Sequence, residues 1–310
     1  MRLFISETID VIKKSWTKYW EDGPIKLAAT LSFVMVFAIP VILTMILSLL
    51  GLFLNEEDLL YMFHNGLDDH VDRQVANLIQ QVILNYKAST GTPGSMGLII
   101  FIFVLASTTL FAVLQNSLNY IWRIKPKPRY TFIKAMKDRS LSFLIILGLG
   151  IIFFGSLILD AYIFLVKDYF DAVLPNYTFM ALRVSKFIII FLAVTLTFAV
   201  LFKFLPDADI VWGVTWFGAI VTSLLFSFGK FLITFGLTHI AIGPIYGPAG
   251  PIVILLLWVF YSAMIFFFGV QVTAQYAAST ARPIMPKKHA VVFEIIELNH
   301  VKKDEEDELP

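Results

Sequence analysis

Six long apolar stretches dominate the pattern of hydrophobic and polar positions along the chain. They fall at 25–54, 95–122, 140–166, 179–205, 211–235 and 251–278, and shorter segments with charges or turn residues separate them. A helix rises about 1.5 Å per residue, so each stretch can cross a hydrocarbon layer of about 30 Å. The pattern predicts an all-α membrane protein with a six-helix transmembrane domain over residues 25–280.

The last apolar stretch follows a segment rich in Gly and Pro, at 243–251. Proline has no backbone N–H, and glycine adopts φ values that other residues avoid, so we expect no helix to run through this segment. Lipid cannot satisfy an irregular backbone, so the segment should be packed in protein or lie at the interface, as broken helices do in transporters. The residues of this predicted broken turn are Gly243, Pro244, Tyr246, Gly247 and Gly250.

Residues 1–24 carry a helical stripe of apolar side chains with basic residues beside it. The stripe has spacings of 4, 3, 4 and 3 and consists of Ile5, Ile9, Ile12, Trp16 and Tyr19. Lys13, Lys14 and Lys18 lie off the stripe, and Trp and Tyr favour the membrane interface. We predict an amphipathic helix on the cytoplasmic membrane surface; a helix packed on a partner protein is the alternative.

The segments between the spans indicate how the protein is oriented. Residues 55–94 form the longest loop and contain a second helical stripe, which predicts a helix on the outer surface. Residues 123–139 hold seven basic side chains: Arg123, Lys125, Lys127, Arg129, Lys134, Lys137 and Arg139. Basic loops stay in the cytoplasm, so we expect a multi-pass protein of the bacterial inner (plasma) membrane with both termini cytoplasmic. The tail, 281–310, should be disordered at its charged end.

The composition supports a membrane protein and narrows the chemistry. Of 310 residues, 58% are hydrophobic and 15% charged, whereas a soluble domain has about 25% charged residues. The net charge of +1 does not suggest a nucleic-acid partner. Cysteine is absent, which excludes disulfides, thiolate metal sites and a cysteine nucleophile.

Nothing in the sequence has the pattern of a catalytic centre. The histidines are scattered over both predicted sides of the membrane: His64, His70, His239, His289 and His300. No P-loop, GxSxG or HExxH pattern occurs. We therefore expect a protein that is not an enzyme and holds no metal and no cofactor.

Ionisable residues inside the spans form the first candidate site. Asp160, Lys186 and Lys230 fall at similar depths below the outer ends of their predicted helices, and Arg183 lies one turn from Lys186. Charges in a span are costly and usually face a cavity or each other. Asp160 could neutralise a lysine and leave a positive patch for an anionic lipid headgroup; alternatively, the lysines extend to the interface.

Side-chain amides within the spans form the second candidate group. Its members are Gln115, Asn116, Asn119, Gln271 and Gln275. Amides in a span usually join helices, and the alternative is that they line a path.

Several stretches resemble a family of bacterial membrane proteins. They are LAATLSF and IPVILTMI in the first span, LQNSLNYIW ending the second, LPDADIVW, SFGK, and YGPAG, LLLWVFYSA and FGVQVTA at the last span. In this order they resemble the YihY/BrkB family over about residues 20–280. The resemblance implies a polytopic inner-membrane protein, variously linked to serum resistance or suspected of transport; an older ribonuclease BN label is regarded as mistaken. The family often has an acidic residue where this chain has Gln271.

Two hypotheses for the function remain open. The first is transport or translocation of a lipid or other amphiphile, with membrane lipids as partners. The second is a scaffold that organises the envelope without a substrate. We expect no ribonuclease activity, and the sequence leaves oligomerisation open.

Overall fold

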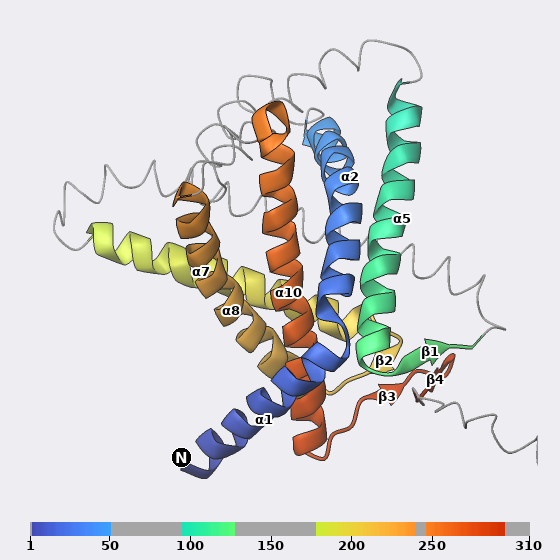
Figure 1. Ribbon diagram of the computed structural model, residues 1–310, viewed down its shortest axis with the longest axis vertical. Coiled ribbons are helices and arrows are strands. Elements are labelled where there is room, and N and C mark those ends of the chain that lie inside the picture. The colour runs from blue at the N-terminus through green and yellow to red at the C-terminus, as the bar shows by residue number, and fades with distance from the viewer. Residues whose placement is uncertain (1, 51–94, 128–177, 240–245, 295–310) are drawn as a thin grey trace, which may run out of the picture.

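The computed structural model describes residues 2–50, 95–127, 178–239 and 246–294 (Figure 1). The long helices in these ranges are α1 (Arg2–Glu21), α2 (Pro24–Leu50), α5 (Ser95–Ile121), α7 (Thr178–Phe204), α8 (Trp212–His239) and α10 (Gly250–Ser279). All except α1 are long and apolar enough to span a membrane. The all-α membrane fold is therefore confirmed. The predicted span 140–166 and the outer-loop helix within 55–94 lie outside the described residues.

Helix α10 stands at the centre of the described helices. It packs against α8 and α2 along much of its length and against α1 near its C-terminal end, and α5 packs on the other side of α2 (Figure 1). Helix α7 packs on α8. The last apolar stretch of the sequence is thus the helix around which the others assemble.

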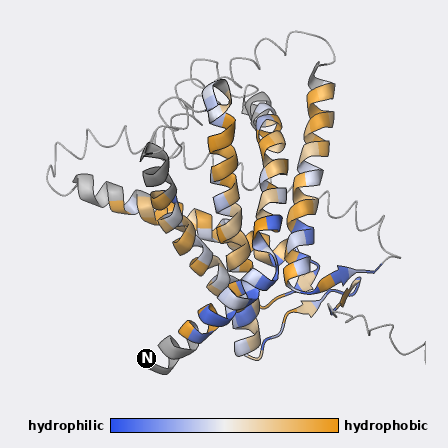
Figure 2. Cartoon of the chain, viewed as in Figure 1, coloured by the Kyte–Doolittle hydropathy of each residue, from blue (hydrophilic) through white to orange (hydrophobic). Residues whose placement is uncertain are grey.

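The outer faces of the spans present large apolar side chains. Six phenylalanines among the described residues each expose 60–67% of their surface: Phe33, Phe37, Phe101, Phe187, Phe228 and Phe231. Figure 2 shows the same hydrophobic colouring over most of the length of the spans. Apolar surface on this scale is unfavourable in water and favourable against acyl chains, so these faces fit a lipid environment.

Helices α8 and α10 meet through two reciprocal pairs of glycine and threonine. A Cβ at Gly218 of α8 would lie 1.9 Å from the Thr273 Oγ1 of α10, and a Cβ at Gly269 would lie 1.8 Å from the Thr222 Oγ1 of α8. Each threonine hydroxyl donates to the carbonyl of its own helix's glycine, Thr222 to Gly218 at 2.6 Å and Thr273 to Gly269 at 2.8 Å. Small residues let helices approach closely in a membrane, and here no hydroxyl is left unsatisfied.

Four short strands join distant parts of the chain at one end of the helices. Strand β1 (Ile124–Pro126) pairs antiparallel with β4 (Ala290–Val292), and β2 (Ala208–Asp209) pairs antiparallel with β3 (Met285–Pro286). We call the end of the bundle that carries β1–β4 the sheet end. The sequence did not predict these strands, because each has only two or three residues and forms only where the ends of α5, α7 and α10 come together.

Helix α1 has two apolar faces rather than one. Val11, Ser15 and Tyr19 recur every four residues and are buried, and the Tyr19 hydroxyl donates to the Met264 carbonyl of α10 at 2.9 Å. An adjacent face leaves four large side chains exposed: Ile9, Ile12, Trp16 and Trp20. The predicted stripe therefore divides: Tyr19 packs on the chain's own α10, while Ile9, Ile12 and Trp16 remain available to a membrane surface.

The Gly/Pro segment is more regular than its sequence suggested. A 3₁₀ helix, η2 (Gly247–Ala249), leads directly into α10, and the Gly250 N–H donates to the Gly247 carbonyl. The expectation that no helix runs through was wrong from Gly247 onward, because the first turn of a helix tolerates proline. Gly247 has a φ of +51°, which a residue with a Cβ adopts only with strain, and a Cβ there would meet no described atom within 4 Å. That the segment is packed in protein or lies at the interface stays a prediction. Tyr246 is exposed, while Gly243 and Pro244 lie outside the described residues.

Candidate functional site

A buried carboxylate links three parts of the chain at the sheet end. Asp207 follows α7, and its side chain is only 3% exposed. Its Oδ2 accepts a hydrogen bond from the Asn119 Nδ2 of α5 at 2.8 Å, and its backbone N–H donates to the Asn119 Oδ1 at 2.9 Å. The Gln115 Nε2 lies 3.4 Å from Oδ1, and the His289 Nε2 lies 3.0 Å from the same oxygen. We call these four residues the Asp207 node.

The C-terminal segment adds backbone contacts to the Asp207 node. The Lys287 N–H donates to the Asp207 carbonyl at 2.9 Å, and the Lys287 Nζ donates to the Pro206 carbonyl at 2.8 Å. Together with β2–β3 pairing, these bonds hold residues 285–289 against the turn after α7. A buried carboxylate is stable only when it is well hydrogen-bonded, so each of these partners contributes to the stability of the sheet end.

A second acidic residue joins the start of the bundle to the turn after α5. Asp22, between α1 and α2, accepts from the Arg123 Nη2 at 2.5 Å, and its side chain is 3% exposed. Burial raises the pKa of the Asp22 carboxyl, and the charges of Arg123 and Lys18 only partly offset that effect. The Arg123 carbonyl also accepts from the Phe293 N–H at 2.9 Å, so the same turn holds the C-terminal segment. The Asp22 Oδ2 has no hydrogen-bond partner among the described residues.

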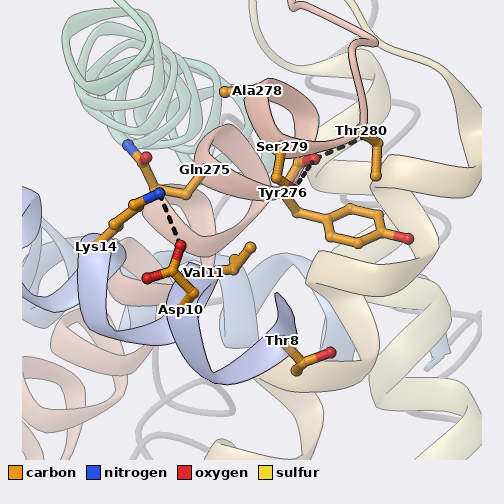
Figure 3. A pocket seen from close by; sticks show the side chains of 9 residues that line it. All are labelled: Thr8, Asp10, Val11, Lys14, Gln275, Tyr276, Ala278, Ser279 and Thr280. Carbon is orange, nitrogen blue, oxygen red and sulfur yellow. Dashed lines mark hydrogen bonds and ion pairs between the residues drawn. The ribbon is translucent and has the colours of Figure 1, made fainter. Parts of the chain in front are cut away.

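A pocket of about 340 Å³ opens between α1 and the last turns of α10 (Figure 3). It is a candidate ligand site, because polar and apolar side chains line it together. Lys14 and Asp10 of α1 form an ion pair of 2.7 Å in its wall, and Gln275 of α10 also lines it. The other lining residues are Thr8, Val11, Tyr276, Ala278, Ser279 and Thr280.

Gln271 lies one helical turn deeper on α10 than Gln275. It is 2% exposed, and its Oε1 has no hydrogen-bond partner among the described residues. A buried amide oxygen without a donor costs about 1–3 kcal/mol, so a water or another bound donor would stabilise this position. The five amide side chains predicted as one candidate group therefore lie in different places. Gln115 and Asn119 belong to the Asp207 node, and Gln275 lines the pocket. Asn116 is exposed, and Gln271 is buried in α10.

The described residues include too little of the predicted cluster of charges to test it. Asp160 lies outside them, and only the backbone of Arg183 and Lys186, on α7, is described. Lys230 is on α8 with an exposed side chain. The pairing of these residues stays a prediction. Where the structure describes the chain, no group of three His, Asp or Glu side chains is arranged to hold a metal ion.

The comparison with protein families covers the Asp207 node and the α10 side of the pocket, but not the lining residues Thr8, Asp10, Val11 and Lys14 of α1. Residues 15–291 match the family model described as "Virulence factor BrkB". The chain belongs to this family. The match includes α1 from Ser15 onward, the five described spans and the strands of the sheet end. It confirms the resemblance that the sequence motifs indicated.

Individual BrkB relatives are distant, and their names describe only membrane proteins. A UPF0761 membrane protein of Ralstonia nicotianae is 25% identical over 265 residues, which are 82% of this chain and 56% of that protein. One of Vibrio cholerae is 28% identical over 207 residues, or 66% of each chain. One of Psychromonas ingrahamii is 26% identical over 264 residues, covering 84% and 85%. This chain thus covers little more than half of the Ralstonia protein. No solved structure matches.

The stretches that carried the BrkB resemblance supply the contacts described above. LQNSLNYIW contributes Gln115 and Asn119, and LPDADIVW contributes Asp207. FGVQVTA contributes Gly269 and Thr273 to the contact with α8. The residues that the sequence did not single out are Asp207, His289, Asp22 and the lining of the pocket on α1. LPDADIVW carries the family resemblance, but no local pattern in it indicates that Asp207 is buried.

Proposed function

We propose that this BrkB protein lies in the bacterial inner membrane with both termini in the cytoplasm and translocates a lipid or other amphiphile. The observation that carries the proposal is the pocket between α1 and α10. Its wall contains both charged and apolar groups, and the exposed Ile9, Ile12, Trp16 and Trp20 of α1 lie on the same helix. A site with this mixture, next to an interfacial helix, suits a molecule with a polar head and an apolar tail.

The arrangement of the loops supports the proposed orientation. The basic loop begins with β1, the turn after α7 contains β2, and the C-terminal segment contains β3 and β4. The distribution of basic residues predicts that all three lie on the cytoplasmic side, and all three meet at the sheet end. If one of these three segments lay on the other side of the membrane, its strands could not pair with those of the other segments.

Single-cysteine labelling tests the orientation. The chain has no cysteine, so each introduced thiol is the only one present. A cysteine replacing Val291, exposed in β4, should react with a membrane-impermeant maleimide only after the membrane is opened. A cysteine replacing Tyr246, exposed before η2, should react from outside in intact spheroplasts. Labelling of both from one side would contradict the proposed topology.

Translocation can be measured in proteoliposomes that contain a phospholipid with a fluorescent acyl chain. Dithionite destroys fluorescence only in the outer leaflet, so a translocating protein should extend the loss beyond that of protein-free vesicles. Ala278→Trp, which fills the pocket, should slow the additional loss several-fold. Ile252→Trp, at an exposed position near the other end of α10, is the matched control and should not. Bleaching equal to protein-free vesicles would refute translocation.

The Asp207 node favours a second candidate function, a non-transporting envelope scaffold. Its bonds connect α5, the turn after α7 and the C-terminal segment into one rigid unit at the sheet end. Such a unit could present residues 285–294 to other envelope components. A protein that leaves vesicle bleaching unchanged yet folds normally would support this alternative.

A further inference from the structure

We infer that the pocket between α1 and α10 binds the headgroup of a zwitterionic phospholipid that carries a phosphate and a primary ammonium group. The inference deepens the proposed function and rests on it only in placing the pocket at a membrane surface. It names the class of amphiphile from the charges in the pocket wall.

The charges in the pocket wall are balanced. The Asp10 Oδ2 and the Lys14 Nζ lie 2.7 Å apart, one turn from each other on α1, and they are the charged side chains among the residues that line the pocket. Their side chains are 59% and 66% exposed, so each has room for another partner. A purely anionic headgroup would meet Asp10, and a purely cationic one would meet Lys14. A headgroup with both charges can satisfy both residues.

Neighbouring groups on α10 favour one orientation of such a headgroup. The C-terminal end of a helix carries a partial negative charge and favours a cation. Ser279 and Thr280 lie at this end, and their hydroxyls already donate to the Tyr276 carbonyl at 3.0 and 2.8 Å. Their oxygens therefore remain as acceptors, which suits the three N–H groups of an ammonium near Asp10.

The phosphate would lie at Lys14, next to the ammonium, because the Lys14 Nζ and the Asp10 Oδ2 are only 2.7 Å apart. Lys14 of α1 and Gln275 of α10 line the pocket from its two facing helices (Figure 3). An ammonium and a side-chain amide both donate hydrogen bonds, and phosphate oxygens only accept them. The Lys14 Nζ and the Gln275 amide thus form a donor pair for the phosphate, while Asp10 and the hydroxyls form an acceptor set for the headgroup amine.

The exposed apolar face of α1 places the pocket at the level of lipid headgroups. Ile9, Ile12 and Trp16 are 49%, 39% and 55% exposed. They lie on a different face of α1 from Asp10 and Lys14, because helix residues one or two positions apart do not face each other. Tryptophan is enriched where lipid headgroups meet acyl chains. Helix α1 therefore holds the pocket where a phospholipid headgroup can enter it, whereas a soluble phosphate compound is not concentrated there.

Lipid binding to the purified full-length protein, measured by native mass spectrometry, tests the inference. We expect phosphatidylethanolamine to bind about tenfold more tightly than phosphatidylcholine, whose trimethylammonium donates no hydrogen bonds, and more tightly than phosphatidylglycerol. Free phosphoethanolamine should bind far more weakly than the lipid. Asp10→Asn should abolish the preference for ethanolamine over choline, and Lys14→Gln should weaken both lipids about equally.

Lys13→Gln is the matched control, because Lys13 is an exposed neighbour that does not line the pocket. It should bind like the wild type, and all three variants should keep the wild-type melting temperature. Phosphatidylglycerol binding as tightly as phosphatidylethanolamine, or an unchanged preference in Asp10→Asn, would overturn the inference. Headgroup selectivity without translocation would refute the proposed function and leave the binding site standing; translocation without selectivity would do the reverse.

Discussion

Replacing Gly269 with alanine should reduce the free energy of unfolding by about 3 kcal/mol, at the upper end of the usual cost of overpacking. The added Cβ would lie 1.8 Å from the Thr222 Oγ1 and 2.8 Å from the Thr222 Cβ. Rotation of the threonine can move its hydroxyl but not its Cβ, so α8 and α10 must separate. The melting temperature of the detergent-solubilised protein measures the effect.

Two further variants separate this clash from a general effect of the substitution. Gly97→Ala in α5 is the matched control, because a Cβ there meets no described atom within 4 Å, and it should leave the melting temperature unchanged or slightly higher. Adding Thr222→Gly to Gly269→Ala removes the opposing Cβ and should restore part of the loss. A Gly269→Ala protein that melts with the wild type would show that the helices are not in this contact.

Replacing Asp207 with alanine should destabilise the protein by a similar amount, about 3 kcal/mol. The change removes the acceptor of the buried Asn119 amide and the partner of His289 and Gln115. Each buried donor left without an acceptor costs about 1–3 kcal/mol. The C-terminal segment should also detach, so trypsin should cleave after Lys287 and Lys288 many times faster than in the wild type.

The control for Asp207 lies two residues away. Asp209 is in β2 with an exposed side chain, and Asp209→Ala removes the same charge without breaking the Asp207 node. It should keep the wild-type melting temperature and the slow cleavage of the tail. If Asp207→Ala and Asp209→Ala behaved alike, the hydrogen bonds of the Asp207 node would contribute nothing measurable.

The spans could be predicted from the sequence because their signal is local. Expected limits of 95–122, 179–205 and 251–278 correspond to Ser95–Ile121, Thr178–Phe204 and Gly250–Ser279. An uninterrupted apolar run of this length must be helical in lipid, since no water is present to satisfy its backbone. Helix α1 could also be predicted from a local signal, because the spacing of its apolar residues is helical whatever the helix packs against.

The candidate site could be predicted only in part. Side-chain amides in a span are conspicuous, so the sequence alone indicates Gln115, Asn119 and Gln275 as candidate residues. Asp207 and His289, 82 residues apart in the chain, were not, because a carboxylate in a polar turn looks exposed until the C-terminal segment covers it. The pocket likewise depends on α1 lying against α10, which no local pattern specifies.

By itself, the sequence determined the class of the protein, the position of its described spans and its membership of the BrkB family. Hydrophobic length is sufficient for the class and the spans, and the resemblance of motifs in their order indicates the family. The tertiary structure alone decided which face of α1 is buried, that Thr222 and Thr273 pack on glycines of the opposite helix, and that the C-terminal segment closes over Asp207. These features depend on contacts between segments far apart in the chain, and their energies appear only when the helices have packed.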